Sequence, residues 1–160
     1  MYKILNKKEL AADTILLEVS APRIAESALP GQFLIVKMKE HSERIPLTIS
    51  DYDLEKGSVT IVFKVIGKST REMSQLQVGD SFRDIVGPLG RCSEFVHLCP
   101  EELKDRKFVF VGGGVGIAPI YPQVKWLHNH GVTCDCIIGA KTHSLLVYEE
   151  ELRPMCNLYV

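Results

Sequence analysis

The stretch Lys107–Pro119, with the sequence KFVFVGGGVGIAP, constrains the fold of this chain more than any other. Its apolar residues Phe108–Val111 suit a strand that is buried on both faces, as in a parallel sheet. Four glycines come after this strand, where they allow a sharp turn and a close approach of a ligand to the backbone: Gly112, Gly113, Gly114 and Gly116. Ile117–Pro119 then predict the start of a helix. This order predicts a phosphate-binding turn, because unpaired N–H groups and the positive end of a helix dipole would face the anion.

The glycine spacing leaves an alternative open. The strict dinucleotide fingerprint is G-x-G-x-x-G, and counted from Gly112 and Gly114 its third glycine is replaced by Ile117. A glycine run after a strand can also be a tight turn with no ligand. The segment therefore favours phosphate or dinucleotide binding, and the plain turn stays as the alternative.

Composition excludes several classes of partner. The chain has 160 residues, a net charge of −1 and 46% hydrophobic residues, which is typical of a globular protein of one domain or slightly more. A charge near neutrality gives no electrostatic argument for nucleic acid or for an acidic membrane surface. We find no apolar run of membrane-spanning length and no signal-peptide core in MYKILNKKEL, so we expect a cytoplasmic protein.

The cysteines predict no metal site. The chain has an odd number of them and no Cys-x-x-Cys pair: Cys92, Cys99, Cys134, Cys136 and Cys156. Cys134 and Cys136 fall two residues apart in a predicted strand and therefore on one face of it. We expect buried free thiols in a reducing compartment, with neither a metal ion nor an iron–sulfur cluster bound by these residues.

Short runs of alternating residues fill roughly the first hundred positions. The expected strands are Tyr2–Leu10, Thr14–Ser20, Phe33–Met38, Leu47–Ser50, Ser58–Val65 and Ser81–Val86, with turns between them at Pro30-Gly31, Asp51–Asp53, Glu55–Gly57 and Gly79-Asp80. This spacing predicts a small antiparallel β barrel. We expect one helix within it, at Thr70–Leu76, and a linker at Lys104–Arg106.

The pattern after the linker changes to strand, helix, strand. Ile117, Ile120, Val124 and Leu127 keep helical spacing, and Gly131 ends that helix. The remaining elements expected are a strand at Thr133–Ile138, a short acidic helix near Leu146–Leu152 and a strand at Asn157–Val160. The fold class is therefore a β barrel followed by an α/β nucleotide-binding domain that is incomplete, because such a domain is built from two halves and only the first is present.

Three motifs carry a resemblance to the ferredoxin-NADP reductase superfamily. RIPLTIS at Arg44–Ser50 resembles its flavin-binding motif, Arg-x-aromatic or aliphatic-Ser/Thr. GGGVGIAP resembles its nicotinamide-nucleotide loop, and GPLG at Gly87–Gly90 resembles its interdomain turn. The order of the motifs follows the family along the whole chain. The chain is most similar to the alpha (small) subunits of NADH-dependent ferredoxin-NADP oxidoreductases, also known as sulfide dehydrogenase subunits, and is related to the electron-transfer subunits of dihydroorotate dehydrogenase.

The resemblance implies a flavoprotein electron-transfer subunit. Residues 1–103 would form the FAD-binding barrel, and residues 104–160 would form the N-terminal half of a NAD(P)-binding domain. Electrons would pass from NAD(P)H through FAD to a 2Fe-2S centre, and then to ferredoxin or to a larger catalytic flavoprotein subunit. Family members hold that centre in a C-terminal cysteine cluster, so we expect this chain to be a truncated form with poor activity. The alternatives are a dihydroorotate dehydrogenase subunit and a non-catalytic flavin-binding or assembly module.

By the same resemblance, Arg44–Ser50 would bind the flavin. Thr48 takes the place of the Ser/Thr whose hydroxyl bonds the reactive flavin nitrogen N5, and it is the catalytic candidate. The ring would lie against Pro46, Leu47, Thr48 and Ile49, with Leu47 where many relatives stack an aromatic ring. Arg44 is the candidate for the FAD pyrophosphate. It lies one residue earlier than the family spacing, so an exposed charge at a strand edge is the alternative.

A second segment would hold the FAD pyrophosphate. The family uses the turn and helix start at this place, here Gly67, Ser69 and Thr70, with Phe63, Lys64 and Val65 nearby. Ser69–Glu72 also fits a helix capping box, and the two roles are compatible. GKST is not a P-loop, because Val62 stands where that motif requires glycine.

The nucleotide candidates lie in the second half of the chain. The pyrophosphate would meet the loop residues Gly113, Gly114, Val115, Gly116 and Ile117, and the adenosine ribose would meet Gly139 and Lys141. No acidic residue stands there to hold a ribose 2′-hydroxyl, and Lys141 suits a 2′-phosphate, so the choice between NADH and NADPH stays open. The five histidines form no triad-like arrangement with Ser, Cys or Asp.

Overall fold

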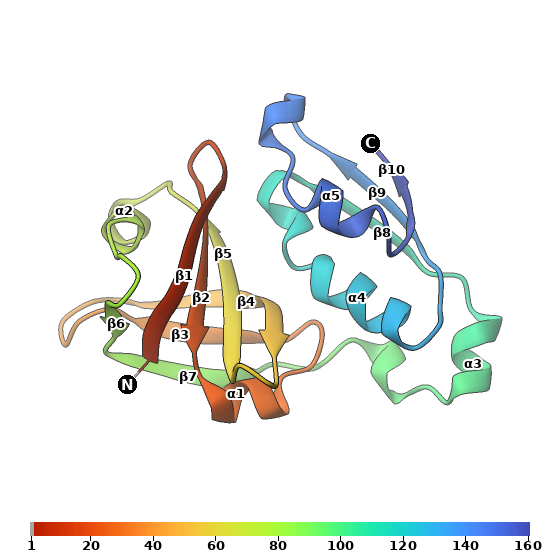
Figure 1. Ribbon diagram of the computed structural model, residues 1–160, viewed down its shortest axis with the longest axis horizontal. Helices are drawn as coiled ribbons and strands as arrows, with labels where there is room; N and C mark the ends of the chain where they lie inside the picture. The colour runs from red at the N-terminus through yellow and green to blue at the C-terminus, as the bar shows by residue number, and fades with distance from the viewer. Residues whose placement is uncertain (1) are drawn as a thin grey trace.

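The computed structural model describes residues 2–160, which form a seven-stranded antiparallel sheet and a three-stranded parallel sheet. The two sheets lie side by side in Figure 1. The first sheet contains β1 Tyr2–Ala11, β2 Thr14–Ser20, β3 Phe33–Lys37, β4 Arg44–Asp53, β5 Ser58–Lys64, β6 Ser81–Phe82 and β7 Asp84–Leu89. The second contains β8 Val109–Gly113, β9 Asp135–Gly139 and β10 Asn157–Tyr159. The helices are α1 Pro22–Ser27, α2 Lys68–Ser74, α3 Pro100–Asp105, α4 Tyr121–Asn129 and α5 Glu149–Leu152.

The seven-stranded sheet is a nearly closed barrel, which confirms the predicted antiparallel barrel. Its strand order is β6-β1-β2-β5-β4-β3-β7, so β6 and β7 stand at opposite edges. Only Arg83 separates these two strands in sequence, and the chain therefore brings both edges together. Side chains alternate between the inside and the outside of the barrel, as the period of two requires. On β5, Val59, Ile61 and Phe63 belong to the barrel core.

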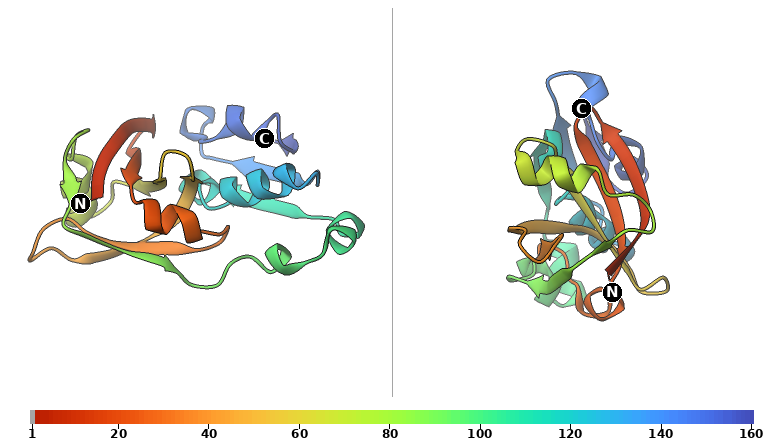
Figure 2. Two further views of the ribbon diagram at one scale, coloured as in Figure 1. Left: turned by 60° about the horizontal axis from the view of Figure 1, so that its bottom comes forward. Right: turned by 90° about the vertical axis from the view of Figure 1, so that its left-hand side faces the viewer.

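The parallel sheet carries its helices on one face. The strand order is β10-β9-β8, and α4 and α5 supply Val124, Leu127 and Leu152 to a second core beside the barrel. Gly113 at the end of β8 lies opposite Gly139 at the end of β9, so the carboxyl ends of both strands meet at one edge. The predicted order of a barrel followed by an α/β unit is confirmed. Figure 2 shows the two parts at the ends of an elongated molecule.

The glycine loop forms a tighter turn than we expect from the sequence. Gly114–Ile117 is a 3₁₀ turn, and α4 begins at Tyr121 rather than at Ile117–Pro119. Gly114 has a φ of +53°, which a regular helix does not allow. Pro122 stands in the first turn of α4, where a missing N–H has no cost.

The prediction that β8 is buried on both faces is wrong. Val109 is 59% exposed and Val111 is 70% exposed. Within residues 2–160, α4 and α5 cover only the opposite face of the sheet. On that covered face Phe108 and Phe110 make edge contacts with Phe95, with ring centroids 5.6 and 6.4 Å apart.

Strand pairing changes two predicted boundaries of the barrel. β4 begins at Arg44 instead of Leu47, because Arg44–Thr48 pairs with β3, and it runs to Asp53 along β5 through the predicted turn. The predicted strand Ser81–Val86 is divided into β6 and β7, which pair with different neighbours. Each difference comes from a partner strand that is distant in sequence.

Helix boundaries differ as well. The predicted linker Lys104–Arg106 falls largely in α3, where Pro100 opens the helix and the Glu102 carboxylate accepts a hydrogen bond from the Cys99 N–H at 3.0 Å. α1 was not expected, and Pro22 stands in its first turn. α2 begins and ends two residues before the predicted helix. The short acidic helix predicted near Leu146–Leu152 is α5, and it covers only the end of that range.

Cys134 and Cys136 are buried on one face of the parallel sheet, as predicted. Burial raises the pKa of Cys134 to about 11 and the pKa of Cys136 to about 12. Both side chains therefore stay protonated near neutral pH and act as small apolar groups in the second core. No helix within residues 2–160 has the length and apolar character needed to cross a membrane.

The packing of β8 against α4 yields the first prediction. A Cβ added to Gly112 would lie 2.5 Å from the Cδ1 atom of Ile120 and 3.3 Å from the Cα atom of Ile117. Gly112→Ala should therefore lower the free energy of unfolding by about 1–3 kcal/mol through overpacking. Gly139→Ala is the matched control, because a Cβ at Gly139 meets no atom within 4 Å. Urea denaturation of both variants measures the difference, and equal stabilities would contradict this account of the packing.

Candidate functional site

A cleft of about 520 Å³ opens between the barrel and the carboxyl edge of the parallel sheet. Four segments distant in sequence line it: Thr14 of β2, Lys64 of β5, Gly113, Gly114 and Val115 of the glycine loop, and Gly139, Ala140, Lys141 and Leu145 at and after the end of β9. In open α/β sheets, ligands bind outside the carboxyl ends of the strands. The fold therefore brings five residues expected to meet the nucleotide into one cavity: Gly113, Gly114, Val115, Gly139 and Lys141. Lys64, which was expected near the FAD pyrophosphate, lines the same cavity.

The wall of this cleft formed by the parallel sheet is bare backbone. A Cβ at Gly114 or Gly139 would meet no atom within 4 Å, and one at Gly113 would meet only the Gly139 carbonyl oxygen at 3.8 Å. Space in front of these glycines is thus open to a ligand. The positive φ of Gly114 adds a second requirement for glycine, since other residues rarely adopt that conformation.

The charge of the cleft suits an anion. Lys64 and Lys141 are its only charged lining residues, and both are exposed. An exposed lysine contributes about 1 kcal/mol to an ion pair in water, so these two side chains can select an anion without fixing its position. Backbone N–H groups of the loop are better suited to positioning it, because they do not depend on a flexible side chain.

The flavin candidates are divided between the two faces of β4. Ile45, Leu47 and Ile49 pack toward the barrel core. Because side chains alternate along a strand, Arg44 and Thr48 share the opposite, outer face with Pro46 between them. The one-residue offset of Arg44 from the family spacing therefore leaves it on the same face as Thr48.

Arg44 is engaged with another residue of the barrel. Its guanidinium Nη1 atom lies 3.2 Å from the Asp84 carboxylate on β7, and both side chains are largely exposed. An exposed ion pair of this kind contributes about 0–1 kcal/mol, so a phosphate group could replace Asp84 at little cost. This geometry agrees with the alternative interpretation of Arg44 as an exposed charge on its strand.

The start of α2 and the β3–β4 connection line a second cavity, of about 460 Å³. Thr70 Oγ1 accepts hydrogen bonds from the Ile66 and Gly67 N–H groups, each at 3.0 Å, so Thr70 is the capping residue rather than Ser69. Ser69 instead donates to the Glu43 carboxylate. The predicted capping box Ser69–Glu72 is therefore wrong, because the helix is capped at Gly67 with Thr70 at the third helical position. The first-turn N–H groups of α2 still lack acceptors within the helix.

Three candidates can offer only backbone groups to a ligand. Phe63 is 3% exposed, Ile49 is 1% exposed and Ile117 is fully buried. Val65 is partly buried against the barrel core. Their side chains pack in the two cores. Other candidate residues lie beside them in the same strand or turn.

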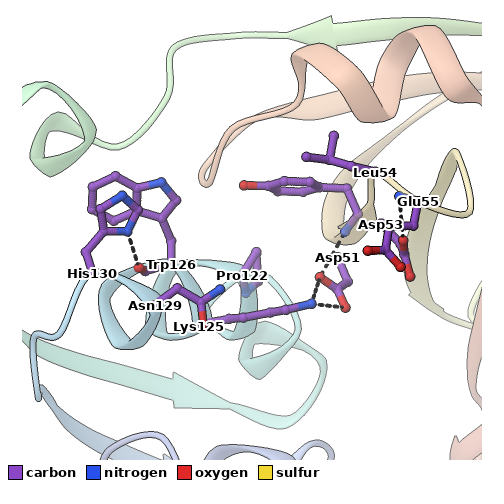
Figure 3. A pocket seen from close by; sticks show the side chains of 10 residues that line it. Asp51, Asp53, Leu54, Glu55, Pro122, Lys125, Trp126, Asn129 and His130 are labelled. Atoms are coloured by element: carbon purple, nitrogen blue, oxygen red, sulfur yellow. Dashed lines mark hydrogen bonds and ion pairs between the residues drawn. The ribbon is translucent and has the colours of Figure 1, made fainter.

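Sequence reasoning missed a third cavity, of about 280 Å³, between the end of β4 and α4 (Figure 3). The Lys125 ammonium group binds both Asp51 carboxylate oxygens, at 2.7 and 2.9 Å, on one side of it. Trp126 and His130 stack on the other side, with ring centroids 3.6 Å apart. The acidic residues at the end of β4 are visible in the sequence, but nothing in the sequence pairs Asp51 with a lysine 74 positions later.

Ser50 is a second residue that sequence reasoning left without a role. It is 1% exposed, and its hydroxyl donates to the Ala118 carbonyl oxygen at 2.9 Å. The Tyr148 hydroxyl lies 3.0 Å from the same Ser50 oxygen. The Tyr148 ring stacks on Tyr121, with centroids 4.5 Å apart and planes 9° from parallel. Burial raises the pKa of Tyr148 and raises that of Tyr121 to about 12, so both phenols stay protonated.

These features define a class of protein. An antiparallel barrel and a parallel β-α-β unit share a cleft, and glycine backbone forms the wall at the ends of two parallel strands. This is the arrangement of a two-part protein that binds a phosphate-bearing ligand between its parts. No metal-binding group of three or more His, Cys, Asp or Glu side chains is found among residues 2–160.

Comparison with known proteins agrees with this class. No protein-family model matches the chain. A Clostridium beijerinckii protein described as an uncharacterized protein in adh 3'region is 55% identical over 161 residues, which cover 100% of this chain and 54% of that protein. A Thermotoga maritima protein, named dihydroorotate dehydrogenase B (NAD(+)), electron transfer subunit homolog, is 36% identical over 99% of this chain and 54% of its own length.

Solved structures extend the comparison. The structure of an NADH-dependent reduced ferredoxin-NADP oxidoreductase matches with a TM-score of 0.89 at 36% identity, over 99% of this chain and 55% of that one. Ferredoxin-NADP+ reductase from Plasmodium falciparum matches with a TM-score of 0.78 at 17% identity, over 99% of this chain and 68% of that one, and shares the fold.

The chain belongs to the ferredoxin-NADP reductase superfamily and is related to its dihydroorotate dehydrogenase B electron-transfer subunits. This confirms the resemblance carried by the RIPLTIS and GGGVGIAP motifs. The chain spans about half the length of the first curated relatives that it matches.

Proposed function

We propose that this chain is the flavin- and nucleotide-binding part of an electron-transfer subunit that exchanges electrons with NAD(P)H. Residues 1–103 are proposed as the FAD-binding part and residues 104–160 as the first half of the NAD(P)-binding part. The observation that carries the proposal is the shared cleft, where Lys64 of the barrel faces the glycine loop and the end of β9. The relatives named as electron-transfer subunits support it.

The residues present fit a dinucleotide in the cleft. Glycine backbone at Gly113, Gly114 and Gly139 leaves space for a pyrophosphate at its wall. Lys64 and Lys141 offset negative charge from the barrel side and the sheet side. Lys141 is also placed after β9, where a ribose 2′-substituent is expected, and with no acidic residue among the lining residues a 2′-phosphate is tolerated.

The outer face of β4 fits a flavin. Arg44 and Thr48 share this face with Pro46, and the pairing of Thr48 with Phe33 fixes its place in the barrel. Open space in front of Gly67 leaves the first turn of α2 accessible to a phosphate. FAD, when bound, supplies the redox-active ring that takes up two electrons and releases them singly.

In this proposal the chain's own residues bind and orient the flavin and the nucleotide. Thr48 offers a hydroxyl at the ring, and Arg44 offers a guanidinium to the pyrophosphate once it leaves Asp84. The glycine loop presents the nucleotide, and the barrel wall at Thr14 and Lys64 closes the cleft opposite it. Proximity and orientation are the main requirements of such a transfer, so no general base is needed.

Onward electron transfer would use groups outside these residues. We propose a 2Fe-2S centre held by a further part of the protein, and delivery to ferredoxin or to a larger catalytic subunit in the cytoplasm. The chain of residues 1–160 by itself should bind FAD but oxidise NAD(P)H poorly, because it contains only the first half of the nucleotide-binding part.

Absorption spectroscopy tests the proposal directly. Residues 1–160 purified with added FAD should be yellow, with about one flavin per chain as expected for one barrel site. Under anaerobic conditions NADH or NADPH should bleach the flavin rapidly in the complete natural protein and slowly in residues 1–160. A colourless protein after FAD addition would overturn the proposed function. A yellow complete protein that neither nucleotide bleaches would favour a non-catalytic flavin-binding module.

The role of Thr48 is tested by removing its hydroxyl. Thr48→Ala should slow flavin reduction in the complete protein by about 10–100-fold, the effect of losing one positioned hydrogen bond at the reacting group. Thr48→Ser, which keeps the hydroxyl, should retain most of the rate. Stopped-flow absorbance measures both, and equal rates for the alanine variant and the wild type would remove Thr48 from the site.

The assignment of FAD to the barrel and of the nucleotide to the second part is tested at Gly114. Gly114→Val should raise the apparent dissociation constant of the nucleotide at least about tenfold, because a branched side chain is strained at a φ of +53° and projects into the space for the ligand. FAD content should stay unchanged. Loss of flavin from this variant would show that the assignment of the two cofactors to the two parts is mistaken.

A dihydroorotate dehydrogenase subunit is the second candidate, because several curated relatives carry that name. Both candidates use the same cleft and differ in the electron acceptor. Reduction of ferredoxin by the complete protein with its partner would favour the first, and coupling to a dihydroorotate-oxidising subunit would favour the second.

A further inference from the structure

Ser50 occupies an irregular place in β4. The pairing of β4 with β5 shifts between Ile49 and Asp51, so Ser50 is the extra residue of a β-bulge. A bulge turns one side chain away from its regular direction. Here the Ser50 hydroxyl reaches the second part of the molecule, 68 and 98 residues further along the chain.

The directions of the two hydrogen bonds follow from their partners. The Ala118 carbonyl can only accept, so the Ser50 hydroxyl proton is committed to it at 2.9 Å. Tyr148 must then donate its own proton to the Ser50 oxygen at 3.0 Å. Ser50 and Tyr148 are both buried, so loss of either hydroxyl leaves the other without its buried partner.

Each partner of Ser50 ends a segment that lines the cleft. Ala118 follows the loop Gly114–Ile117 directly, and its N–H donates to Val115, a lining residue, at 3.1 Å. Tyr148 lies three residues after Leu145, the last lining residue of the segment that follows β9. Ser50 of the barrel therefore hydrogen-bonds to residues next to both segments of the second part that line the cleft.

Tyr148 itself is held in an unusual conformation. Its φ of 60° belongs to the left-handed region, which is costly for a tyrosine and persists only where the surroundings fix it. Stacking on Tyr121 at the start of α4 fixes its ring. The Asp51–Lys125 ion pair, at 2.7 Å, adds a neighbouring contact between β4 and α4.

We propose that Ser50 and Tyr148 are positioning residues, which hold the nucleotide-binding segments at a fixed distance from the strand that carries Thr48. Ser50 lies two residues after Thr48 on that strand. Displacement of the glycine loop would change the alignment of the reactants more than the affinity for the nucleotide. The consequence for the reaction rests on the proposed function, whereas the fixed geometry can be measured without any cofactor.

The first test measures backbone opening in residues 1–160. Ser50→Ala and Tyr148→Phe should speed hydrogen exchange of the amides from Val115 to Tyr121 by about tenfold or more, because a buried anchor of this segment is lost. Ser58→Ala is the matched control: Ser58 is also 1% exposed, and its hydroxyl donates to Glu18 within the barrel at 2.7 Å. Equal exchange in this segment for the Ser50 and Ser58 variants would overturn the proposal.

The second test uses the complete natural protein with FAD. Both positioning variants should lower the limiting rate of flavin reduction by about tenfold or more, while the nucleotide dissociation constant changes by less than about threefold. Ser58→Ala should change neither. Unchanged rates in Ser50→Ala and Tyr148→Phe would overturn the positioning role, even if the exchange test succeeds. Failure of the wild-type protein itself to be reduced would instead overturn the proposed function.

A double variant separates positioning from general destabilisation. With both hydroxyls removed, no unpaired phenol remains, and only the Ala118 carbonyl lacks its donor, as it does in Ser50→Ala alone. Ser50→Ala combined with Tyr148→Phe should therefore be less destabilised than the sum of the two single variants. Its reduction rate should remain low, because the fastening is still absent. Recovery of the wild-type rate together with stability would show that the two residues act only on folding and would overturn the proposal.

Discussion

The packing between the barrel and the parallel sheet, to which β4 adds directed contacts, determines the geometry of the shared cleft. The barrel has its own core, whereas the second core includes Ala11 and Val62 of the barrel and therefore joins the two parts. Ser50 and Asp51 add to this apolar packing one buried hydrogen-bonded group and one partly exposed ion pair. Of the two, the buried group is the stronger constraint, because an unpaired buried hydroxyl costs about 1–3 kcal/mol and a partly exposed ion pair about 1 kcal/mol or less.

The same comparison of magnitudes explains how the site can be preformed and still accept a ligand. Next to the glycine wall, Gly112 lies so close to Ile120 that no room is left for a Cβ, and this packing supports the wall. The charged residues that would meet phosphate are held weakly, as the exposed pair of Arg44 and Asp84 illustrates. A rigid backbone surrounded by easily released side chains binds an anion without rearranging the fold.

The sequence was informative where local chemistry decides the structure. Alternation of apolar residues predicted the barrel strands, and the glycine run predicted the loop that lines the cleft. Prediction from the sequence failed where contacts between distant residues determine the structure. The extension of β4 depends on pairing with β3 and β5, and the exposure of Val111 depends on which faces receive helices. Ser50 stood inside a recognised motif, but its role depends on Tyr148, 98 residues away, which no local pattern connects to it.

The exposed face of the parallel sheet has a practical consequence. Val109 and Val111 lie on β8, which is an edge strand in the described part of the chain, and Ile137 and Tyr159 extend the apolar surface across the sheet. Edge strands with branched apolar side chains are templates for pairing between molecules. Concentrated solutions of these 160 residues are therefore prone to self-association through this surface, and their colloidal behaviour depends on what shields it.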